Sequence, residues 1–256
     1  MTMPNFSLKG KVALITGGSR GIGKATALGF ANSGADVAVA SRKLPDLEQV
    51  AAEIEGLGRK ALPVSAHVGR LEEIKGLVDK VYQEFGKIDI LVNNAGTSPA
   101  LSPILDLEER LWESFMNLNL KGVIFLSQAV AKVMKEHGGG TIINVSSVAA
   151  FRHEPHNAMY AITKAAVVTA TKIMAQEWAE YNIRVNAIAP GHVHTRLGDS
   201  IFGAVPEYEE EFLKRVPMGR IGDPDEIVGA MIYLASDASS YVTGETIVVD
   251  GGALTT

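Results

Sequence analysis

The sequence predicts an α/β protein with a doubly wound, mostly parallel sheet of seven strands and helices on both faces. Short apolar runs alternate with longer amphipathic segments along the whole chain, which is the rhythm of βαβ units. The runs are rich in Val, Ile and Ala, as expected for parallel strands that are buried on both faces. With 256 residues, 46% of them hydrophobic, the chain can bury a large core, so we expect residues 1–256 to form a single domain.

Each element follows from its own pattern and length. Compact apolar runs bounded by polar or glycine-rich segments predict strands at residues 12–16, 37–40, 61–65, 88–92, 142–146, 184–188 and 246–249. Between them, helical periodicity predicts helices at about residues 22–33, 44–57, 71–85, 107–136, 158–180 and 224–235. Gly, Pro and an acidic run interrupt this rhythm between residues 195 and 220. A long connection in a compact domain often has a function, so we expect a substrate loop near 195–220.

Charge and composition exclude several classes of protein. The formal charge is −5 and the Lys and Arg residues are scattered, so we expect no nucleic-acid partner. The chain has no Cys and therefore has neither disulfides nor a thiolate metal site. The N-terminal residues lack the pattern of a signal peptide, and no apolar stretch is long enough to cross a membrane. We therefore expect a soluble, cytoplasmic protein with no membrane partner.

A glycine-rich segment directly follows the first predicted strand and opens the first helix. It reads Thr16-Gly17-Gly18-Ser19-Arg20-Gly21-Ile22-Gly23. Glycines at this place let the backbone turn tightly and approach a pyrophosphate, whose charge is met by free N–H groups at the helix N-terminus. A tight strand-to-helix turn without a ligand is the alternative. The position between strand and helix favours a Rossmann-like site for a dinucleotide.

Three side chains in the middle of the chain indicate proton chemistry. Tyr160 and Lys164 are four residues apart in a predicted helix and so lie on one face. An ammonium beside a phenol favours the phenolate and lowers the pKa of the phenol, which makes it a usable proton donor and acceptor. Ser147 follows a predicted buried strand, where its hydroxyl could hold a carbonyl oxygen against the phenol. An exposed helical pair is the alternative interpretation of Tyr160 and Lys164.

Together these motifs resemble the classical short-chain dehydrogenase/reductase family, in particular its NADP-dependent carbonyl reductases, over nearly the whole chain. Further motifs that carry the resemblance are Asn93-Asn94-Ala95-Gly96, Asn119 in the segment 118–122, and Pro190-Gly191 followed by Thr195. The resemblance implies that Tyr160 is the general acid and base, that Ser147 polarises the substrate oxygen, and that Lys164 binds the nicotinamide ribose and lowers the pKa of Tyr160. It also implies that Asn119 holds a water in a proton relay.

The same resemblance assigns the binding residues. The expected cofactor site comprises Gly17, Ser19, Arg20, Gly21, Ile22, Gly23, Ser41, Arg42, His67, Val68, Asn93, Ala95, Gly96, Tyr160, Lys164, Pro190, Gly191, Val193 and Thr195. Phe151 and His153 are expected to line the substrate pocket with Ser147 and Tyr160. Some assignments have structural alternatives: Asn94 could bond backbone beside the first strand, and Thr195 could cap a following helix.

Histidines complicate two of these assignments. His67 stands where many family members have an Asp that accepts a hydrogen bond from the adenine amino group; a neutral imidazole can also accept one bond or stack on the base, and a solvated loop histidine is the alternative. His153, His156, His192 and His194 raise the question of zinc. They have neither a Cys nor a clear carboxylate partner, so we expect no metal.

Cofactor choice depends on the end of the second predicted strand. An NAD site usually has an acidic residue there to bind the ribose hydroxyls, whereas this chain has Ser41 followed by Arg42, with Arg20 in the glycine turn. We therefore expect NADP(H), with NAD(H) possible; solvent-exposed arginines are the alternative.

The sequence thus predicts an oxidoreductase that transfers a hydride between NADP(H) and a carbonyl or secondary alcohol. Alternatives are an NAD-dependent alcohol or polyol dehydrogenase, a 3-oxoacyl-carrier reductase and, in a different class, a non-catalytic dinucleotide-binding sensor. The two longest predicted helical segments, near residues 107–136 and 158–180, carry more apolar positions than one face of the sheet needs. Members of the family usually pair these helices between subunits, so we expect a homotetramer.

Overall fold

Seven parallel strands form one continuous sheet in the order β3-β2-β1-β4-β5-β6-β7. The computed structural model describes residues 4–198 and 206–255. The strands are β1 (Val12–Thr16), β2 (Asp36–Ser41), β3 (Ala61–Ser65), β4 (Ile90–Asn93), β5 (Gly140–Val145), β6 (Ile183–Pro190) and β7 (Thr246–Val249). The doubly wound fold is confirmed, and the sheet is parallel throughout rather than mostly so.

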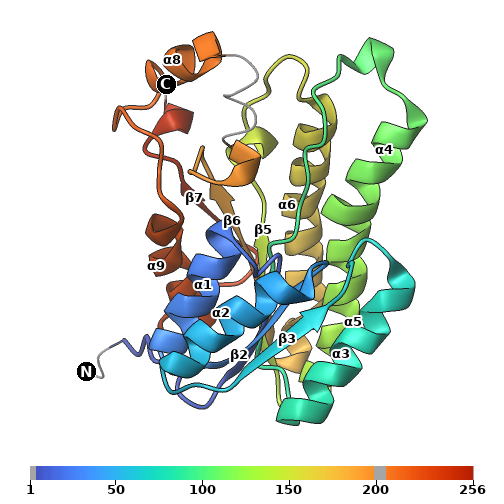
Figure 1. Ribbon diagram of the computed structural model, residues 1–256, viewed down its shortest axis with the longest axis vertical. Coiled ribbons are helices and arrows are strands. Elements are labelled where there is room, and N and C mark those ends of the chain that lie inside the picture. Colours follow the sequence, from blue (N-terminus) through green and yellow to red (C-terminus); the bar gives the residue numbers. More distant parts are fainter. Residues whose placement is uncertain (1–3, 199–205, 256) are drawn as a thin grey trace.

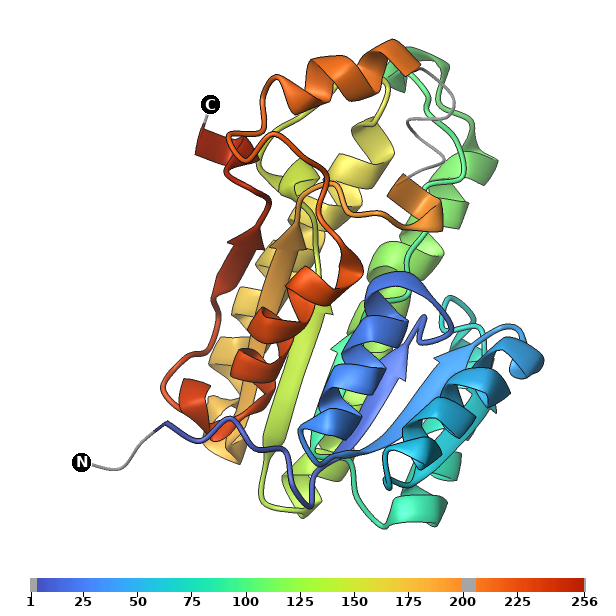
Figure 2. The same cartoon turned by 60° about the vertical axis from the view of Figure 1, so that its left-hand side comes forward.

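Helices cover both faces of the sheet (Figures 1 and 2). One face carries α1 (Gly21–Asn32), α2 (Leu44–Gly56) and α9 (Pro224–Ala235); the other carries α3 (Leu71–Phe85), α5 (Gly122–Glu136) and α6 (Ala158–Trp178). Side chains alternate along a strand, so Ala13 and Ile15 of β1 pack on the first face and Val12 and Leu14 on the second. This alternation produces two apolar cores.

The expected helix at 107–136 consists of three parts. A 3₁₀ turn at Ile104–Asp106 precedes α4 (Glu109–Met116), a π-helical segment occupies Asn117–Lys121, and α5 continues to Glu136. In the π segment the Gly122 N–H donates to the Asn117 carbonyl, five residues back. At the same point a Cβ on Gly122 would lie 2.5 Å from the Val68 carbonyl oxygen, so only glycine allows the helix to pack this closely against the turn after β3.

The segment predicted as a substrate loop contains helix α8 (Pro206–Leu213), while residues 199–205 lie outside the described part of the chain. Helix α8 lies at the carboxyl end of the sheet (Figure 2). In the described ranges no helix is long and apolar enough to cross a membrane.

Candidate active site

A cavity of about 600 Å³ opens at the carboxyl ends of the central strands. The turns after β1, β4, β5 and β6 all contribute to its lining. The sheet order reverses between β1 and β4, and ligands of open α/β sheets bind at such a reversal. The topology therefore places the glycine turn and the Tyr160 region on the walls of one cavity.

The glycine turn is shaped for close approach of another group. Gly17 and Gly21 have positive φ angles of 64° and 52°, which side chains rarely adopt. A Cβ on Gly17 would lie 2.7 Å from Asn94 Nδ2, and one on Gly23 would lie 2.3 Å from the Gly17 carbonyl oxygen. The backbone at the start of α1 is thus exposed to the cavity without side chains in between, and this cradle fits a pyrophosphate.

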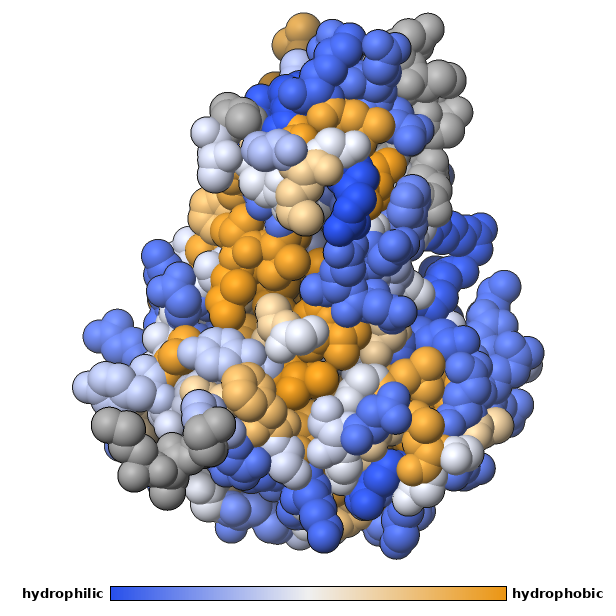
Figure 3. Space-filling model, turned by 90° about the vertical axis from the view of Figure 1, so that its left-hand side faces the viewer, coloured by the Kyte–Doolittle hydropathy of each residue, from blue (hydrophilic) through white to orange (hydrophobic). Residues whose placement is uncertain are grey.

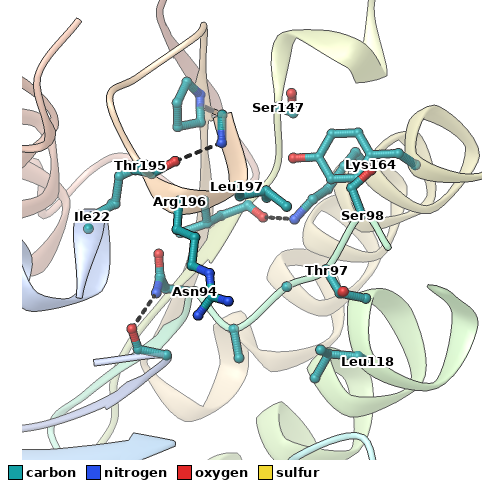
Figure 4. Close-up of a pocket in the computed structure, with 18 of the residues that line it drawn as sticks. Ile22, Asn94, Thr97, Ser98, Leu118, Ser147, Lys164, Thr195, Arg196 and Leu197 are labelled. Atoms are coloured by element: carbon teal, nitrogen blue, oxygen red, sulfur yellow. Dashed lines mark hydrogen bonds between the residues drawn. The ribbon is translucent and has the colours of Figure 1, made fainter. Parts of the chain in front are cut away.

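Hydrogen bonds from the turn after β4 hold the glycine turn in place. The Thr16 hydroxyl accepts from the N–H groups of Asn94 and Ala95, both at 3.1 Å. Asn94 Nδ2 donates to the carbonyl oxygens of Thr16 at 2.9 Å and Gly17 at 3.3 Å (Figure 4). Asn94 therefore bonds to the backbone at the end of the first strand, which is the structural alternative that the sequence left open for it.

Ser147 lies just after β5 and faces the cavity (Figure 4). Its oxygen accepts a 3.1 Å hydrogen bond from the Ala149 N–H, which caps the 3₁₀ turn Val148–Ala150. Because that bond uses a lone pair, the hydroxyl proton is available for another acceptor.

Tyr160 and Lys164 lie on one face of α6 and line the same cavity. Lys164 Nζ is 5.5 Å from the centre of the Tyr160 ring and donates to the Val145 carbonyl at 2.8 Å. Burial lowers the pKa of Lys164 to about 8. Burial also raises the pKa of Tyr160, and a hydrogen bond from Ser147 acts in the opposite direction.

The net shift of the Tyr160 pKa is therefore upward rather than the expected lowering, because burial is its largest cause. The phenol is removed from water, which disfavours the phenolate, and the ammonium donates to backbone rather than to the phenol. Tyr160 is consequently a protonated acid at neutral pH.

Asn119 is fully buried in the π segment and does not line the cavity directly. Its Oδ1 accepts from the Thr97 N–H at 2.8 Å, and its Nδ2 donates to the Thr97 carbonyl at 2.9 Å. Nδ2 also lies 3.4 Å from the Thr163 hydroxyl. The Asn119 amide thus connects the π segment to Thr97, which follows Gly96 in the turn after β4.

Most of the predicted cofactor residues do line the cavity. They are Gly17, Ser19, Arg20, Gly21, Ile22, Ser41, Arg42, His67, Val68, Ala95, Gly96, Tyr160, Lys164, Pro190, Gly191, Val193 and Thr195. Gly23 and Asn93 lie behind this wall. Asn93 Nδ2 donates to Ser127 Oγ and Asn144 Oδ1, both at 2.8 Å, so the side chain joins β4 to α5 and β5 inside the core. Neither Gly23 nor Asn93 lines the cavity itself.

The two expected substrate residues also differ from the prediction. The cavity is lined by Arg152 and Glu154, whereas the side chains of Phe151 and His153 are exposed and lie outside the lining. Arg152 donates to the Ala253 carbonyl at 3.0 Å, and Glu154 lies 3.7 Å from Arg215. These contacts turn Arg152 and Glu154 inward, so that His153 between them and Phe151 before them face outward.

Charged groups therefore line the outer part of the cavity. Burial raises the pKa of Glu154, while Arg215 and Arg152 act against that rise. His192, next to Gly191, also lines the cavity, and burial lowers its pKa to about 4. At neutral pH its imidazole is uncharged.

The sequence left two interpretations of Thr195 open, a cofactor-site residue and a helix cap, and its position is compatible with both. It lines the cavity, and its hydroxyl accepts from the Gly198 N–H at 3.0 Å, as a cap for the helical turn that follows. A Cβ on Gly21 would lie 3.0 Å from Thr195 Cγ2, so the glycine turn and the segment after β6 close upon each other. Arg196 and Leu197 extend this wall (Figure 4).

Several lining residues were not predicted. Lys43 directly follows Arg42, which could have indicated it; Gly69, Arg152, Leu197 and Leu254 carried no motif. Among the described residues, no three His, Cys, Asp or Glu side chains gather closely enough to hold a metal ion.

The chain matches known families and structures over nearly its full length. A family model described as Enoyl-(Acyl carrier protein) reductase matches residues 17–254. The 3-oxoacyl-acyl-carrier-protein reductase of Thermotoga maritima is 44% identical over 247 residues, which cover 96% of this chain and 98% of that protein. The 2-dehydro-3-deoxy-D-gluconate 5-dehydrogenase of Escherichia coli is 43% identical over 257 residues, with 99% of each chain covered.

Two solved structures have nearly the same fold. A gluconate 5-dehydrogenase from Burkholderia cenocepacia, in complex with NADP and tartrate, has a TM-score of 0.94 and 38% identity over 99% of this chain and 98% of that one. A 7α-hydroxysteroid dehydrogenase in complex with NADH has a TM-score of 0.94 and 37% identity, over 98% of this chain and 97% of that one. The chain belongs to the short-chain dehydrogenase/reductase family and is an oxidoreductase that transfers a hydride between a nicotinamide dinucleotide and a CH–OH or C=O group.

Proposed function

We propose that this oxidoreductase uses NADP(H) to interconvert a small, polar carbonyl compound and its secondary alcohol, with Tyr160 as general acid and base. One observation carries the proposal: Ser147, Tyr160 and Lys164 line the same cavity as the glycine turn. A non-catalytic sensor would not require these three groups at one place.

The side chains around the substrate oxygen have different roles. When bound, the nicotinamide supplies or accepts the hydride. As negative charge develops on the oxygen during reduction, the Ser147 hydroxyl donates a hydrogen bond to it, because the Ser147 oxygen already accepts from Ala149. The protonated Tyr160 then donates its proton. In the reverse direction the Tyr160 phenolate removes the proton from the alcohol.

Lys164 and Asn119 support this chemistry in different ways. The Lys164 ammonium is held in the cavity wall by Val145, where it can hydrogen-bond a ribose hydroxyl and stabilise the phenolate. Asn119 acts as a positioning residue, because both ends of its amide are bonded to Thr97. We propose that it fixes the turn containing Gly96, a role that differs from a side chain that holds the relay water.

The preference for NADP(H) is supported by the charges at the end of β2. Ser41 is neutral and places no carboxylate against a 2′-phosphate. Arg20, Arg42 and Lys43 all line the cavity. Charge-assisted hydrogen bonds contribute about 1.5–3 kcal/mol each, so one good contact gives roughly a tenfold to hundredfold preference for NADP(H).

A double variant tests this cofactor preference. Ser41→Asp with Arg42→Ala should reverse the preference towards NAD(H), because the new carboxylate at position 41 repels a 2′-phosphate and the cation at position 42 is removed. The measurement is kcat/KM and the dissociation constant for both cofactors before and after the change. A wild-type enzyme that favours NAD(H) would refute the phosphate site.

The outer cavity supports a hydroxylated, polar substrate. Arg152, Glu154 and Arg215 supply donors and an acceptor there, and burial of a charged group without polar partners is costly. Among the similar proteins are dehydrogenases of gluconate and 2-dehydro-3-deoxy-D-gluconate. Rates with sugar acids, polyols, apolar ketones and acyl-carrier thioesters would test the choice; faster turnover of the thioesters would favour the carrier reductase instead.

We also propose that the enzyme is a cytoplasmic homo-oligomer. Trp112 on α4, Phe125 on α5 and Ile173 on α6 are large exposed apolar side chains on one side of the molecule. On another side, an apolar surface extends over the region of α9 and β7 (Figure 3), where Val248 is exposed. Apolar surfaces of this kind usually mark contacts between subunits.

A further inference from the structure

Three charged side chains from two distant segments line the outer part of the cavity. Arg152 and Glu154 precede α6, and Arg215 follows α8. Arg215 Nη1 lies 3.7 Å from Glu154 Oε1. Burial raises the pKa of Glu154, and the charges of Arg215 and Arg152 act against that rise, so both guanidiniums lie near this one carboxylate.

Residues after β7 hold these two segments together. Arg152 Nη1 donates to the Ala253 carbonyl at 3.0 Å. Ala253 packs with Val216 in a small buried apolar cluster. The Met218 N–H donates to the Gly251 carbonyl at 3.1 Å. The segment before α6 and the segment after α8 are therefore fixed to the same part of the chain, which keeps their charged side chains at one end of the cavity.

The three side chains together carry an excess of positive charge. An arginine side chain stays protonated in proteins, so two cations accompany one carboxylate. The side chains of Glu154 and Arg215 are 21% and 34% exposed, and charges that are partly removed from water need counter-charges nearby. The 3.7 Å between these two groups exceeds the roughly 2.7–2.9 Å of a charge-assisted hydrogen bond. An anion that binds beside both guanidiniums would therefore balance the charge.

The cluster lies one short turn from the reacting groups. The Arg152 N–H donates to the Val148 carbonyl at 3.0 Å, and Ser147 caps the 3₁₀ turn that begins at Val148. Ser147 and Arg152 thus reach the same cavity from the two ends of one turn. Arg196 also lines the cavity, but its side chain points toward Asn94 on the cofactor side (Figure 4). A molecule whose reacting oxygen lies at Ser147 and whose anionic group lies at Arg152 is therefore short.

We propose that Arg152 and Arg215 bind a carboxylate of the substrate, so that the enzyme interconverts a short hydroxy acid and the corresponding oxo acid. This inference rests on the proposed function and names the substrate class of that same site. The planar fork of a guanidinium matches the two oxygens of a carboxylate. Because the fork has five N–H donors, Arg152 can hold the Ala253 carbonyl and a substrate oxygen together. The carboxylate takes no part in the hydride transfer and is unchanged by it.

Matched acids and amides test the effect of the charge alone. The acids 3-hydroxybutyrate and gluconate are compared with their primary amides, which keep the hydroxyl groups and nearly the same shape but carry no charge. The measurement is kcat/KM for oxidation at a saturating concentration of NADP⁺ or NAD⁺, whichever the wild type prefers. The wild type should favour an acid over its amide by about tenfold or more, the effect of one charge-assisted hydrogen bond.

Substitutions assign that preference to the two arginines. Arg152→Gln and Arg215→Gln should each lower the ratio of acid to amide by about tenfold, mainly through a higher KM for the acid. Arg152→Lys, which keeps the charge, should restore part of the ratio. Arg110→Gln, at an exposed residue of α4 outside the cavity lining, is the matched control and should leave the rates and the ratio unchanged.

The outcomes separate this inference from the proposed function. A wild type that oxidises the amides or neutral polyols as fast as the acids, or faster, would overturn the carboxylate site and leave the proposed function in place. An acid preference that persists in both glutamine variants would overturn the site as well, since the arginines would then only hold the loops around the cavity. No turnover of any acid, amide, polyol or ketone would refute the proposed function itself.

Discussion

At the scale of single residues, the buried phenol of Tyr160 determines how the two directions of the reaction depend on pH. Burial raises the pKa of Tyr160, so the proton donor for reduction is present throughout the neutral range. Oxidation requires the phenolate, whose population increases with pH. We expect reduction to be fastest near neutral pH and oxidation to rise toward alkaline pH, as measured by initial rates in both directions.

Removal of the phenolic proton tests the same assignment directly. Tyr160→Phe keeps the ring and its packing, so cofactor affinity should remain, while the rate in both directions should fall by at least about 100-fold, the scale of general acid and base catalysis. Phe151→Ala changes an exposed aromatic residue outside the cavity and serves as the control. Near-normal turnover by Tyr160→Phe would contradict the mechanism.

His192 makes the protein sensitive to acid. Burial lowers its pKa to about 4 from a normal value near 6.5. Between these values the unfolded chain binds a proton that the folded chain excludes, so the free energy of unfolding falls as pH drops from about 6.5 to 4, by up to about 3 kcal/mol. Urea unfolding across this range should show a shallower decline for His192→Asn than for the wild type; parallel curves would contradict the assignment.

Whether the place of such residues could be predicted depends on whether local sequence pattern or contacts with distant residues set their orientation. Tyr160 and Lys164 are related by helical spacing, and Ser147 follows a buried strand at the carboxyl edge of the sheet, so their patterns were sufficient to indicate one site. The outward orientation of Phe151 and His153 could not be predicted from local pattern. It depends on bonds from Arg152 to Ala253 and from Glu154 to Arg215, whose partners lie far along the chain and carry no motif.

At the scale of elements, the strands and most helices followed from their periodicity, but the interruption at Asn117–Lys121 did not. A π segment has no hydrophobic period of its own, and apolar residues continue through it. Its packing against the turn after β3 depends on Gly122 meeting the Val68 backbone, a contact between distant segments. The result is functional, because the buried Asn119 in this segment holds Thr97 beside the cavity.

Two helical glycines provide a matched test of the glycine turn. In α1, a Cβ on Gly23 would lie 2.3 Å from the Gly17 oxygen, whereas a Cβ on Gly76 in α3 would meet no heavy atom within 4 Å among the described residues outside the backbone of its own helix and its chain neighbours. Gly76→Ala should stabilise the protein by about 0.5–1 kcal/mol through helix propensity, with unchanged cofactor affinity. Gly23→Ala should destabilise it and weaken cofactor binding, because the turn must move. Urea unfolding and calorimetric titration measure both effects; equal behaviour of the two variants would contradict the close-approach role.

At the scale of the whole molecule, two separate regions with exposed apolar side chains are candidates for contacts between subunits. Trp112, Phe125 and Ile173 lie on helices α4, α5 and α6, on one face of the sheet. Val248 lies on β7, which among the described strands pairs only with β6 and so forms one edge of the sheet. Two independent contact surfaces on one subunit generate a closed dimer of dimers when each contact is twofold.

Substitutions on either surface should therefore leave a dimer that is held together by the other surface. The wild type should have four times the 27.2 kDa chain mass in light scattering. Phe125→Glu with Ile173→Glu should remove one contact and leave dimers, and Val248→Glu should remove the other and also leave dimers, because a buried unpaired carboxylate is costly. Leu57→Glu, at an exposed apolar residue after α2, should leave the mass unchanged. A wild-type mass of a single chain at micromolar concentration would refute both surfaces, and a tetramer that survives either substitution would show that the subunits meet elsewhere.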